Sequence, residues 1–166
     1  MEIWDAYFKD GTPALRDLYR GEPIPEGLFH LVTETLVRHT DGDYLVMLRD
    51  PKKTNFGGYF EASAGGSALK GEDAGDCALR ELYEECGIKP LSIERIGKYV
   101  SRDTIYISFL CVTDCEKTAV TLQEGETVDF KWLTEKEFSE FIRSDKFIPV
   151  QKYYYSDYFK KIGIDD

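Results

Sequence analysis

The sequence has few of the features that mark membrane proteins or nucleic-acid-binding proteins. No run approaches the roughly 20 apolar residues that a membrane helix needs. The first residues lack a basic segment followed by an apolar one, so we expect no signal peptide. Basic residues are outnumbered, with 21 Lys and Arg against 31 Asp and Glu and a net charge of −10. So negative a surface repels phosphodiester backbones, and we expect neither a nucleic-acid partner nor a membrane partner.

Residues that bind zinc or form disulfides are also scarce. The chain has two histidines and four cysteines, and no two cysteines have the C-x-x-C spacing of a zinc site. The cysteines are Cys77, Cys86, Cys111 and Cys115. We therefore expect reduced, structural thiols in a cytoplasmic protein.

The length of 166 residues suits one domain with a core and is too small for two ordinary ones. Apolar residues make up 42% and charged residues 31%, which is a globular composition. We expect a single domain over residues 1–166, with an N-terminal lead-in over 1–27 and an aromatic C-terminal extension over 144–166. The cluster Tyr153–Phe159 is too aromatic for a free tail, so it should pack on the body or across the interface of a homodimer.

Hydrophobic patterning predicts an α+β fold in which helices pack on a mixed sheet. Strands are predicted over 28–40, 43–49, 59–64, 93–99, 105–112 and 128–132. Helices are predicted over 73–86 and 135–143. The pair Gly65-Gly66 is expected to end the third strand, and Gly87 is expected to cap the first helix at its C-terminus.

Three glutamates crowd one side of the first predicted helix. A residue turns about 100° around the helix axis, so Glu84 lies about 60° from Glu81 and Glu85 about 40° from it. Like charges at these spacings repel each other, and the helix macrodipole disfavours anions near the C-terminus. A bound cation would relieve this repulsion, and oxygen-only ligands favour a hard ion such as Mg²⁺ or Mn²⁺. The alternative is a solvated acidic face.

The residues around these glutamates follow a longer pattern. From Gly66 to Ile88 the sequence reads G-x5-E-x7-R-E-U-x-E-E-x-G-U, where U is aliphatic. Every specified position matches the motif of the Nudix hydrolase family, which this sequence closely resembles. The order of the predicted elements agrees with that family over about residues 28–143. The resemblance implies an α/β/α sandwich with a mixed central sheet.

The resemblance also implies a reaction and a metal site. Nudix proteins cleave a diphosphate linked to a second group, usually a nucleoside, so the expected partner is a small-molecule diphosphate. Such cleavage needs charge neutralisation and an aligned water, which Mg²⁺ (or Mn²⁺) provides. Carried over by position, the metal ligands are Glu81, Glu84, Glu85 and the carbonyl of Gly65.

The remaining motif residues have supporting roles in the family. By resemblance, Arg80 would pair with Glu72 and hold the loop against the helix. Gly66 and Gly87 complete the motif.

A general base and substrate-binding cations are still required. Many Nudix proteins carry a functional Glu where this chain has Glu126, six residues before Trp132, and Glu124 is the close alternative. The motif itself is the other source of a base. Arg49 and Lys53 lie on the loop leading toward the glycine pair, where they could contact the diphosphate.

A second resemblance, to isopentenyl-diphosphate isomerase and its Nudix relatives, comes from outside the motif. The segments that carry it are Trp4-Asp5-Ala6-Tyr7, Gly11-Thr12-Pro13, Phe29-His30-Leu31, Arg49-x3-Lys53 and Phe60. The isomerase has a catalytic Cys, a Gly and a metal-binding His where this chain has Ala64-Gly65-Gly66. Loss of the thiol removes one of the two proton-transfer groups that isomerisation needs.

His30 matches one metal-binding His of the isomerase, but the companion nearer the N-terminus is missing, so a ligand role is not favoured. The hydrolase motif, which is degenerate in the isomerase, is complete here. We interpret the chain as an isomerase-like body with hydrolase chemistry. An isoprenoid-diphosphate isomerase and a non-catalytic Nudix-fold ligand sensor are the alternatives.

Overall fold

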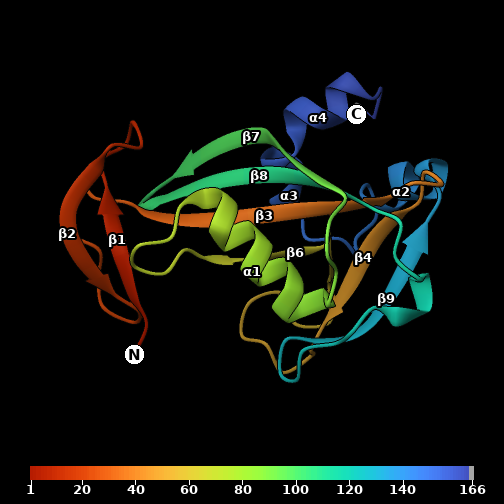
Figure 1. Cartoon of the computed structure of the whole chain (residues 1–166), viewed down its shortest axis with the longest axis horizontal. Coiled ribbons are helices and arrows are strands. Elements are labelled where there is room, and N and C mark those ends of the chain that lie inside the picture. The colour runs from red at the N-terminus through yellow and green to blue at the C-terminus, as the bar shows by residue number, and fades with distance from the viewer. Residues whose placement is uncertain (165–166) are drawn as a thin grey trace.

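A mixed seven-stranded sheet forms the middle layer of the computed structural model, which describes residues 1–164 (Figure 1). The main path of the sheet is β5 (Phe60–Glu61), β4 (Tyr44–Arg49), β3 (His30–His39), β8 (Thr104–Thr113) and β7 (Ser92–Ser101). Outside this path, β6 (Ala64–Ser67) pairs with β3, and β9 (Thr127–Leu133) pairs with β4. β3 and β8 run parallel, and the other pairs are antiparallel.

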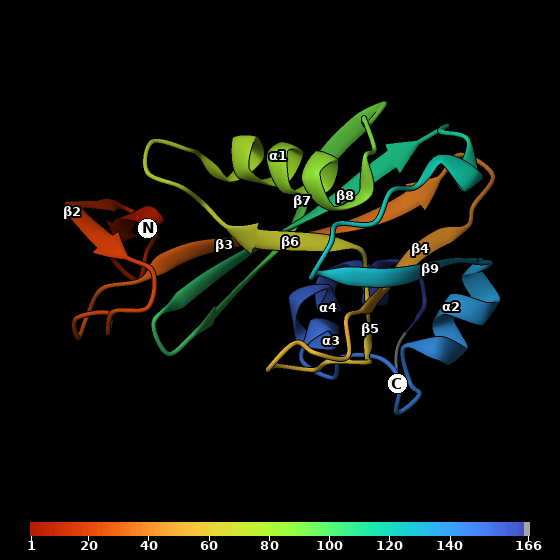
Figure 2. The same ribbon diagram turned by 90° about the horizontal axis from the view of Figure 1, so that it is seen from below.

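Helices cover both faces of this sheet, as Figure 2 shows. One face carries α1 (Ala74–Cys86), and the other carries α2 (Glu135–Phe141), α3 (Gln151–Tyr154) and α4 (Ser156–Lys161). A 3₁₀ turn, η1 (Lys117–Ala119), precedes β9. Successive residues of β3 serve the two sides, because Leu36 packs in the cluster with α2, α3 and α4 whereas Val37 packs in the cluster with α1. The predicted three-layer α+β fold is confirmed.

Within residues 1–164, no helix combines the length and the apolar character needed to cross a membrane.

Local capping explains where α1 begins and ends. The side chain of Asp73 accepts a hydrogen bond of 2.8 Å from the backbone N–H of Asp76. Gly87 has φ = 67° and its N–H donates to the carbonyl of Tyr83 at 2.9 Å, which confirms the predicted cap.

The prediction that Gly65-Gly66 ends a strand is wrong. Both glycines lie inside β6, where they pair with Glu34 and Thr33 of β3, and the strand before them is only Phe60–Glu61. These strand positions have no room for a Cβ atom, because neighbouring carboxylate side chains lie against the α-carbons, as the site geometry below shows.

The N-terminal lead-in forms a separate two-stranded sheet of β1 (Ile3–Tyr7) and β2 (Pro13–Tyr19). This hairpin lies at one end of the molecule (Figures 1 and 2). Trp4, Ala6 and Leu18 form its small buried core. A bridge between Tyr7 and Phe29 joins it to the start of the main body.

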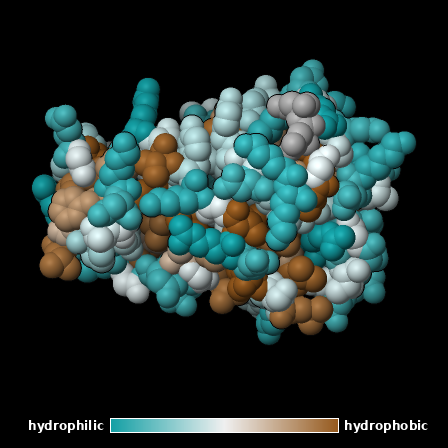
Figure 3. All heavy atoms as spheres, turned by 90° about the horizontal axis from the view of Figure 1, so that it is seen from above, coloured by the Kyte–Doolittle hydropathy of each residue, from teal (hydrophilic) through white to brown (hydrophobic). Residues whose placement is uncertain are grey.

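The C-terminal aromatic cluster packs on the body of the protein. This is one of the two arrangements predicted for it, the other being packing across a homodimer interface. Tyr154, Tyr155, Tyr158 and Phe159 are buried in the cluster with α2. On the side that carries α4, hydrophobic side chains occur in separate groups among hydrophilic ones (Figure 3). The homodimer stays a prediction, and positions 165–166 of the extension lie outside the described residues.

Two hydroxyl groups tie this cluster to the sheet. The hydroxyl of Tyr155 donates to the carbonyl of Ala62 at 2.6 Å, and those of Tyr158 and Tyr44 lie 2.8 Å apart. Burial raises the pKa of the Tyr155 phenol well above its ordinary value, so the group stays a donor.

Removing the hydroxyl of Tyr155 should therefore destabilise the fold. We expect Tyr155→Phe to lower the free energy of unfolding by about 1–2 kcal/mol in urea titrations, because the buried carbonyl of Ala62 loses its donor. The control, Tyr153→Phe, changes a side chain that is 62% exposed and should stay within about 0.5 kcal/mol of the parent. Equal effects of the two variants would contradict this role of the extension.

Candidate active site

Most of the predicted motif residues line a pocket of about 380 Å³ at the edge of the main sheet, and Glu72 and Gly87 lie outside its lining. Its walls come from the β1–β2 hairpin, from β6, from one side of α1, and from the two loops that hold Lys53 and Glu126. Lys53 and Glu126, for example, are 73 residues apart in the sequence and meet at this place. The pocket is the natural candidate for a site that takes a polar ligand.

Arg80 links the pocket wall to the loop before α1. Its Nε and Nη2 atoms donate to the two carboxylate oxygens of Glu72 at 2.6 and 2.9 Å, and Nη2 also donates to the carbonyl of Ser67 at 3.1 Å. Hydrogen bonding from Arg80 lowers the pKa of Glu72. The predicted pairing of Arg80 with Glu72 is confirmed.

The three helix glutamates differ in their surroundings, so the picture of one solvated acidic face is wrong. Glu85 is 6% exposed and faces inward, because the helix packs its last turns on the sheet. Glu81 is partly buried and Glu84 is exposed. The Nη1 atom of Arg80 lies 2.7 Å from the carboxylate of Glu81 and 3.3 Å from that of Glu84.

Two further carboxylates, which sequence reasoning missed, do not line the pocket but lie near enough to Glu85 for their charges to raise its pKa. Glu34 lies in β3 opposite Gly65 and accepts a hydrogen bond of 3.2 Å from the side chain of Gln151. Glu61 lies in β5 and pairs with Arg49 at 3.1 Å. The available signal was a glutamate between two threonines in β3 and a glutamate next to a buried phenylalanine in β5.

Burial and mutual repulsion act on these carboxylates together. Desolvation raises the pKa of Glu85 well above its ordinary value, and the negative charges of Glu61 and Glu81 raise it further. Desolvation and the charge of Glu61 likewise raise the pKa of Glu34. Desolvation also raises the pKa values of Glu61 and Glu81. The fold therefore holds several carboxylates where their ionised forms disfavour one another.

The glycine pair makes room for this cluster. A Cβ atom at position 66 would collide with Oε1 of Glu81, and one at position 65 would lie 2.8 Å from Oε2 of Glu34 and 2.7 Å from the carbonyl of Thr33. Any larger residue would thus displace a carboxylate or the strand. The glycines bring β6 and the glutamates into direct contact.

The chemistry of these residues fits a hard divalent cation. The side chains offer only oxygen donors, and a cation among them would offset the repulsion that raises their pKa values. Within residues 1–164, no three acidic, histidine or cysteine side chains already stand together as a metal-binding group. Glu81 and Glu84 instead turn toward Arg80, so they would have to leave that guanidinium to bind an ion.

The two predicted substrate-binding cations line the pocket but are already paired. Arg49 contacts Glu61 and donates to the carbonyl of Asn55 at 3.0 Å. Lys53 forms an ion pair with Glu126. Of the two loop candidates for the base, Glu126 lines the pocket, whereas Glu124 is exposed and does not line it.

His30 stands apart from the carboxylates. Its ring stacks on Trp4 with centroids 4.6 Å apart, and Nδ1 lies 3.3 Å from the carbonyl of Asp103. Burial lowers the pKa of His30. These contacts give it a packing role at the base of the hairpin.

Comparison with known proteins agrees with this geometry. A family model described as the NUDIX domain matches residues 29–157, which extends past the predicted 28–143 into the C-terminal helices. An uncharacterized Nudix hydrolase of Listeria monocytogenes is 32% identical over 151 residues, covering 90% of this chain and 89% of that protein. A Pseudomonas aeruginosa relative with the same description is 34% identical over 94 residues, covering 57% of this chain and 56% of that protein.

Solved structures share the fold. A Deinococcus radiodurans protein has a TM-score of 0.71 at 18% identity and covers 87% of this chain and 91% of its own. The NUDIX domain of Shewanella oneidensis NrtR, solved in complex with ADP ribose, has a TM-score of 0.64 at 14% identity and covers 87% of this chain and 94% of its own. At these identities the likeness concerns the fold.

The pKa shift of Glu85 leads to a prediction for the metal-free protein. A carboxyl whose pKa is raised on folding binds more protons when folded, so its ionisation destabilises the fold as pH rises from the unfolded value near 4.5 through the raised value. In EDTA at pH 7–8, Glu85→Gln should therefore raise the free energy of unfolding by about 1–3 kcal/mol. The gain should shrink as pH is lowered toward 4.5 and vanish below it, where the parent carboxyl is protonated in both the folded and the unfolded state.

The matched control is Glu84→Gln, in which the changed side chain is 46% exposed. This variant should stay within about 1 kcal/mol of the parent at each pH. A loss of stability in Glu85→Gln at pH 8 would show that the carboxylate of Glu85 is stabilised by a partner rather than repelled.

Proposed function

Because the chain belongs to the NUDIX domain family, we propose that it is a metal-dependent hydrolase of organic pyrophosphates. The proposed reaction is attack by water at phosphorus, which cleaves the pyrophosphate bond of a nucleoside diphosphate derivative or a related compound. The observation that carries the proposal is the buried carboxylate of Glu85 among like charges, at the centre of a complete motif. A purely structural helix gains nothing from such an arrangement.

The proposed metal ligands are Glu81, Glu84, Glu85 and the carbonyl of Gly65, and the proposed ion is Mg²⁺ or Mn²⁺. When bound, such an ion neutralises charge on phosphate oxygens and makes a bound water more acidic. Arg80 keeps α1 and the preceding loop in a fixed relation through Glu72, so the helix glutamates stay aligned with β6.

A side chain of the protein must then accept the proton of the attacking water. We propose that the carboxylate of Glu126 accepts a proton from the attacking water, with Lys53 orienting this carboxylate before the substrate binds. The loop that carries Lys53 is joined to Glu126 by a backbone hydrogen bond of 2.9 Å from Asp50. The proposed base therefore has a fixed position at the edge of the pocket.

The isomerase alternative is disfavoured by one residue. Where the isomerase has its catalytic thiol, Ala64 is 1% exposed and packs in the core against α1. The resemblance to the isomerase subgroup is therefore proposed only for the parts of the chain outside the catalytic motif. A cytoplasmic location is also proposed, and the four cysteines, all free thiols, are compatible with it.

Turnover should depend on the motif carboxylates and on the metal. With Mg²⁺, a screen of nucleoside diphosphate sugars, dinucleoside polyphosphates, CoA and ADP-ribose should identify a substrate by phosphate release. Glu81→Gln and Glu85→Gln should then each lower kcat by about a hundredfold or more and leave the circular dichroism spectrum unchanged, because each removes a ligand from the proposed metal site. EDTA should abolish turnover.

Two loop variants test the proposed base in the same assay. Glu126→Gln should lower kcat by about a hundredfold. Its control, Glu124→Gln, alters an exposed carboxylate two residues away and should keep kcat within about twofold.

Near-normal turnover in both motif variants, Glu81→Gln and Glu85→Gln, would contradict the proposed metal site. Binding of these compounds without any turnover would favour the ligand sensor.

Isopentenyl diphosphate separates hydrolysis from isomerisation. With Mg²⁺ and this compound, the protein should form no dimethylallyl diphosphate, because Ala64 carries no proton-transfer group. Product analysis by proton NMR, which distinguishes the two isomers by the position of their double bond, is the measurement. Formation of the isomer at a rate above that of a protein-free blank would overturn the assignment.

A further inference from the structure

The N-terminal hairpin, which the sequence presented only as a lead-in, contributes a wall of the active-site pocket. Glu2, Trp4 and Arg20 line it together with the helix glutamates. The negative charge of Glu2 is close enough to Glu81 to raise the pKa of that carboxyl. The hairpin is therefore part of the site.

A chain of contacts places Arg20 at the hairpin end of the pocket. The backbone N–H of Arg20 donates to the carbonyl of Glu2 at 3.1 Å, and its guanidinium donates to the Glu2 carboxylate at 2.8 Å. The indole N–H of Trp4 donates to the other oxygen of this carboxylate at 3.3 Å. Trp4 in turn stacks on His30, which belongs to the main sheet.

The cations that line the pocket differ in the free energy needed to move each one from its carboxylate partner to a bound ligand. Arg49 and Arg80 pair with carboxylates whose side chains are 12–19% exposed, so releasing either cation leaves a buried negative charge without a partner. Lys53 is itself only 26% exposed, and moving it to a ligand would take it away from Glu126, the proposed base that it orients.

Arg20 has no such constraint. Its side chain is 65% exposed, and that of Glu2 is 40% exposed. Exposed ion pairs contribute little to stability, and water solvates the carboxylate of Glu2 when the pair opens. Of the cations that line the pocket, Arg20 is therefore the one most easily transferred to an anionic ligand.

We propose that Arg20 binds a negatively charged group of the substrate at the hairpin end of the pocket. This inference rests on the proposed function and narrows its substrate class. The substrate would carry a further phosphate besides the diphosphate that is proposed to lie at the helix glutamates, since Arg20 enters the pocket from the hairpin and those glutamates enter it from α1. Glu2 orients the guanidinium in the free protein and competes with the substrate for it.

Binding of two analogues that lack a P–O–P bridge tests this without turnover. Titration calorimetry with Mg²⁺ would compare the methylene analogue of tripolyphosphate with that of pyrophosphate. Arg20→Ala should raise the Kd of the triphosphate analogue by about tenfold or more and that of the diphosphate analogue by less than about twofold. Arg20→Lys should recover part of the loss, and Glu2→Gln should lower the Kd of the triphosphate analogue severalfold.

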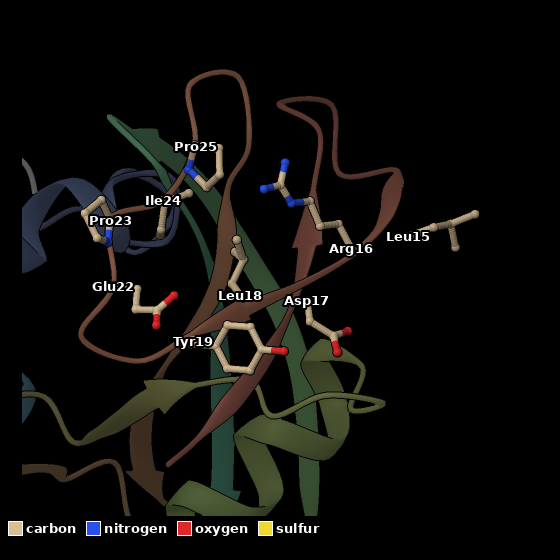
Figure 4. A pocket seen from close by; sticks show the side chains of 9 residues that line it. All are labelled: Leu15, Arg16, Asp17, Leu18, Tyr19, Glu22, Pro23, Ile24 and Pro25. Atoms are coloured by element: carbon tan, nitrogen blue, oxygen red, sulfur yellow. The ribbon is translucent and has the colours of Figure 1, made fainter.

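Arg16→Ala is the matched control. Arg16 lies on the same hairpin in β2, but it lines a separate hollow beside Pro23 and Pro25 (Figure 4). This variant removes the same charge from the hairpin and should bind both analogues like the parent protein.

Each other outcome overturns the inference. Equal effects of Arg20→Ala and Arg16→Ala would assign the loss to general charge. Equal weakening of both analogues in Arg20→Ala would place Arg20 on the diphosphate itself. Failure of the parent to bind the triphosphate analogue would remove the subsite. If no compound is hydrolysed but the Arg20 dependence is found, the proposed function fails and the binding site stands.

Discussion

Repulsion among partly buried carboxylates is the constraint on which the site depends. Glu85 is held inside the fold near Glu81, Glu34 and Glu61, and each charge makes the others less favourable. A protein selected only for stability would replace these groups with apolar ones. The loss of stability from this repulsion is explained if a divalent cation occupies the site during the reaction, since the same carboxylates then become its ligands.

The architecture produces this crowding from ordinary elements. β6 lies beside β3 in the sheet, and α1 packs across both, so the helix glutamates lie against β6 and within reach of the charge of Glu34. The two glycines of β6 allow that approach because they have no side chains. The capped ends of α1 and the fork of Arg80 onto Glu72 fix the helix relative to the strand. On the other face, the aromatic C-terminal cluster supports the sheet.

The sequence allowed the fold class and most elements to be predicted, because their periodicity and caps are local properties. The nine-position motif likewise located α1 and the pairing of Arg80 with Glu72. Glu34 and Glu61 were missed because an isolated glutamate in a strand is informative only once its neighbours across the sheet are known. The glycine pair was misassigned for the same reason, since glycine usually interrupts strands and the contact that requires it here is tertiary. The role of the hairpin in the pocket also depends on long-range packing.

The most direct test of the account is a calorimetric titration of Mn²⁺ into the metal-free protein, in several buffers of different ionisation enthalpy. We predict that Mn²⁺ binds and that protons are released, because an ion at Glu85 displaces the protons that the raised pKa values retain. Both signals should vanish in Glu85→Gln. Absence of Mn²⁺ binding to the parent protein, even with the methylene analogue of pyrophosphate present, would contradict the account.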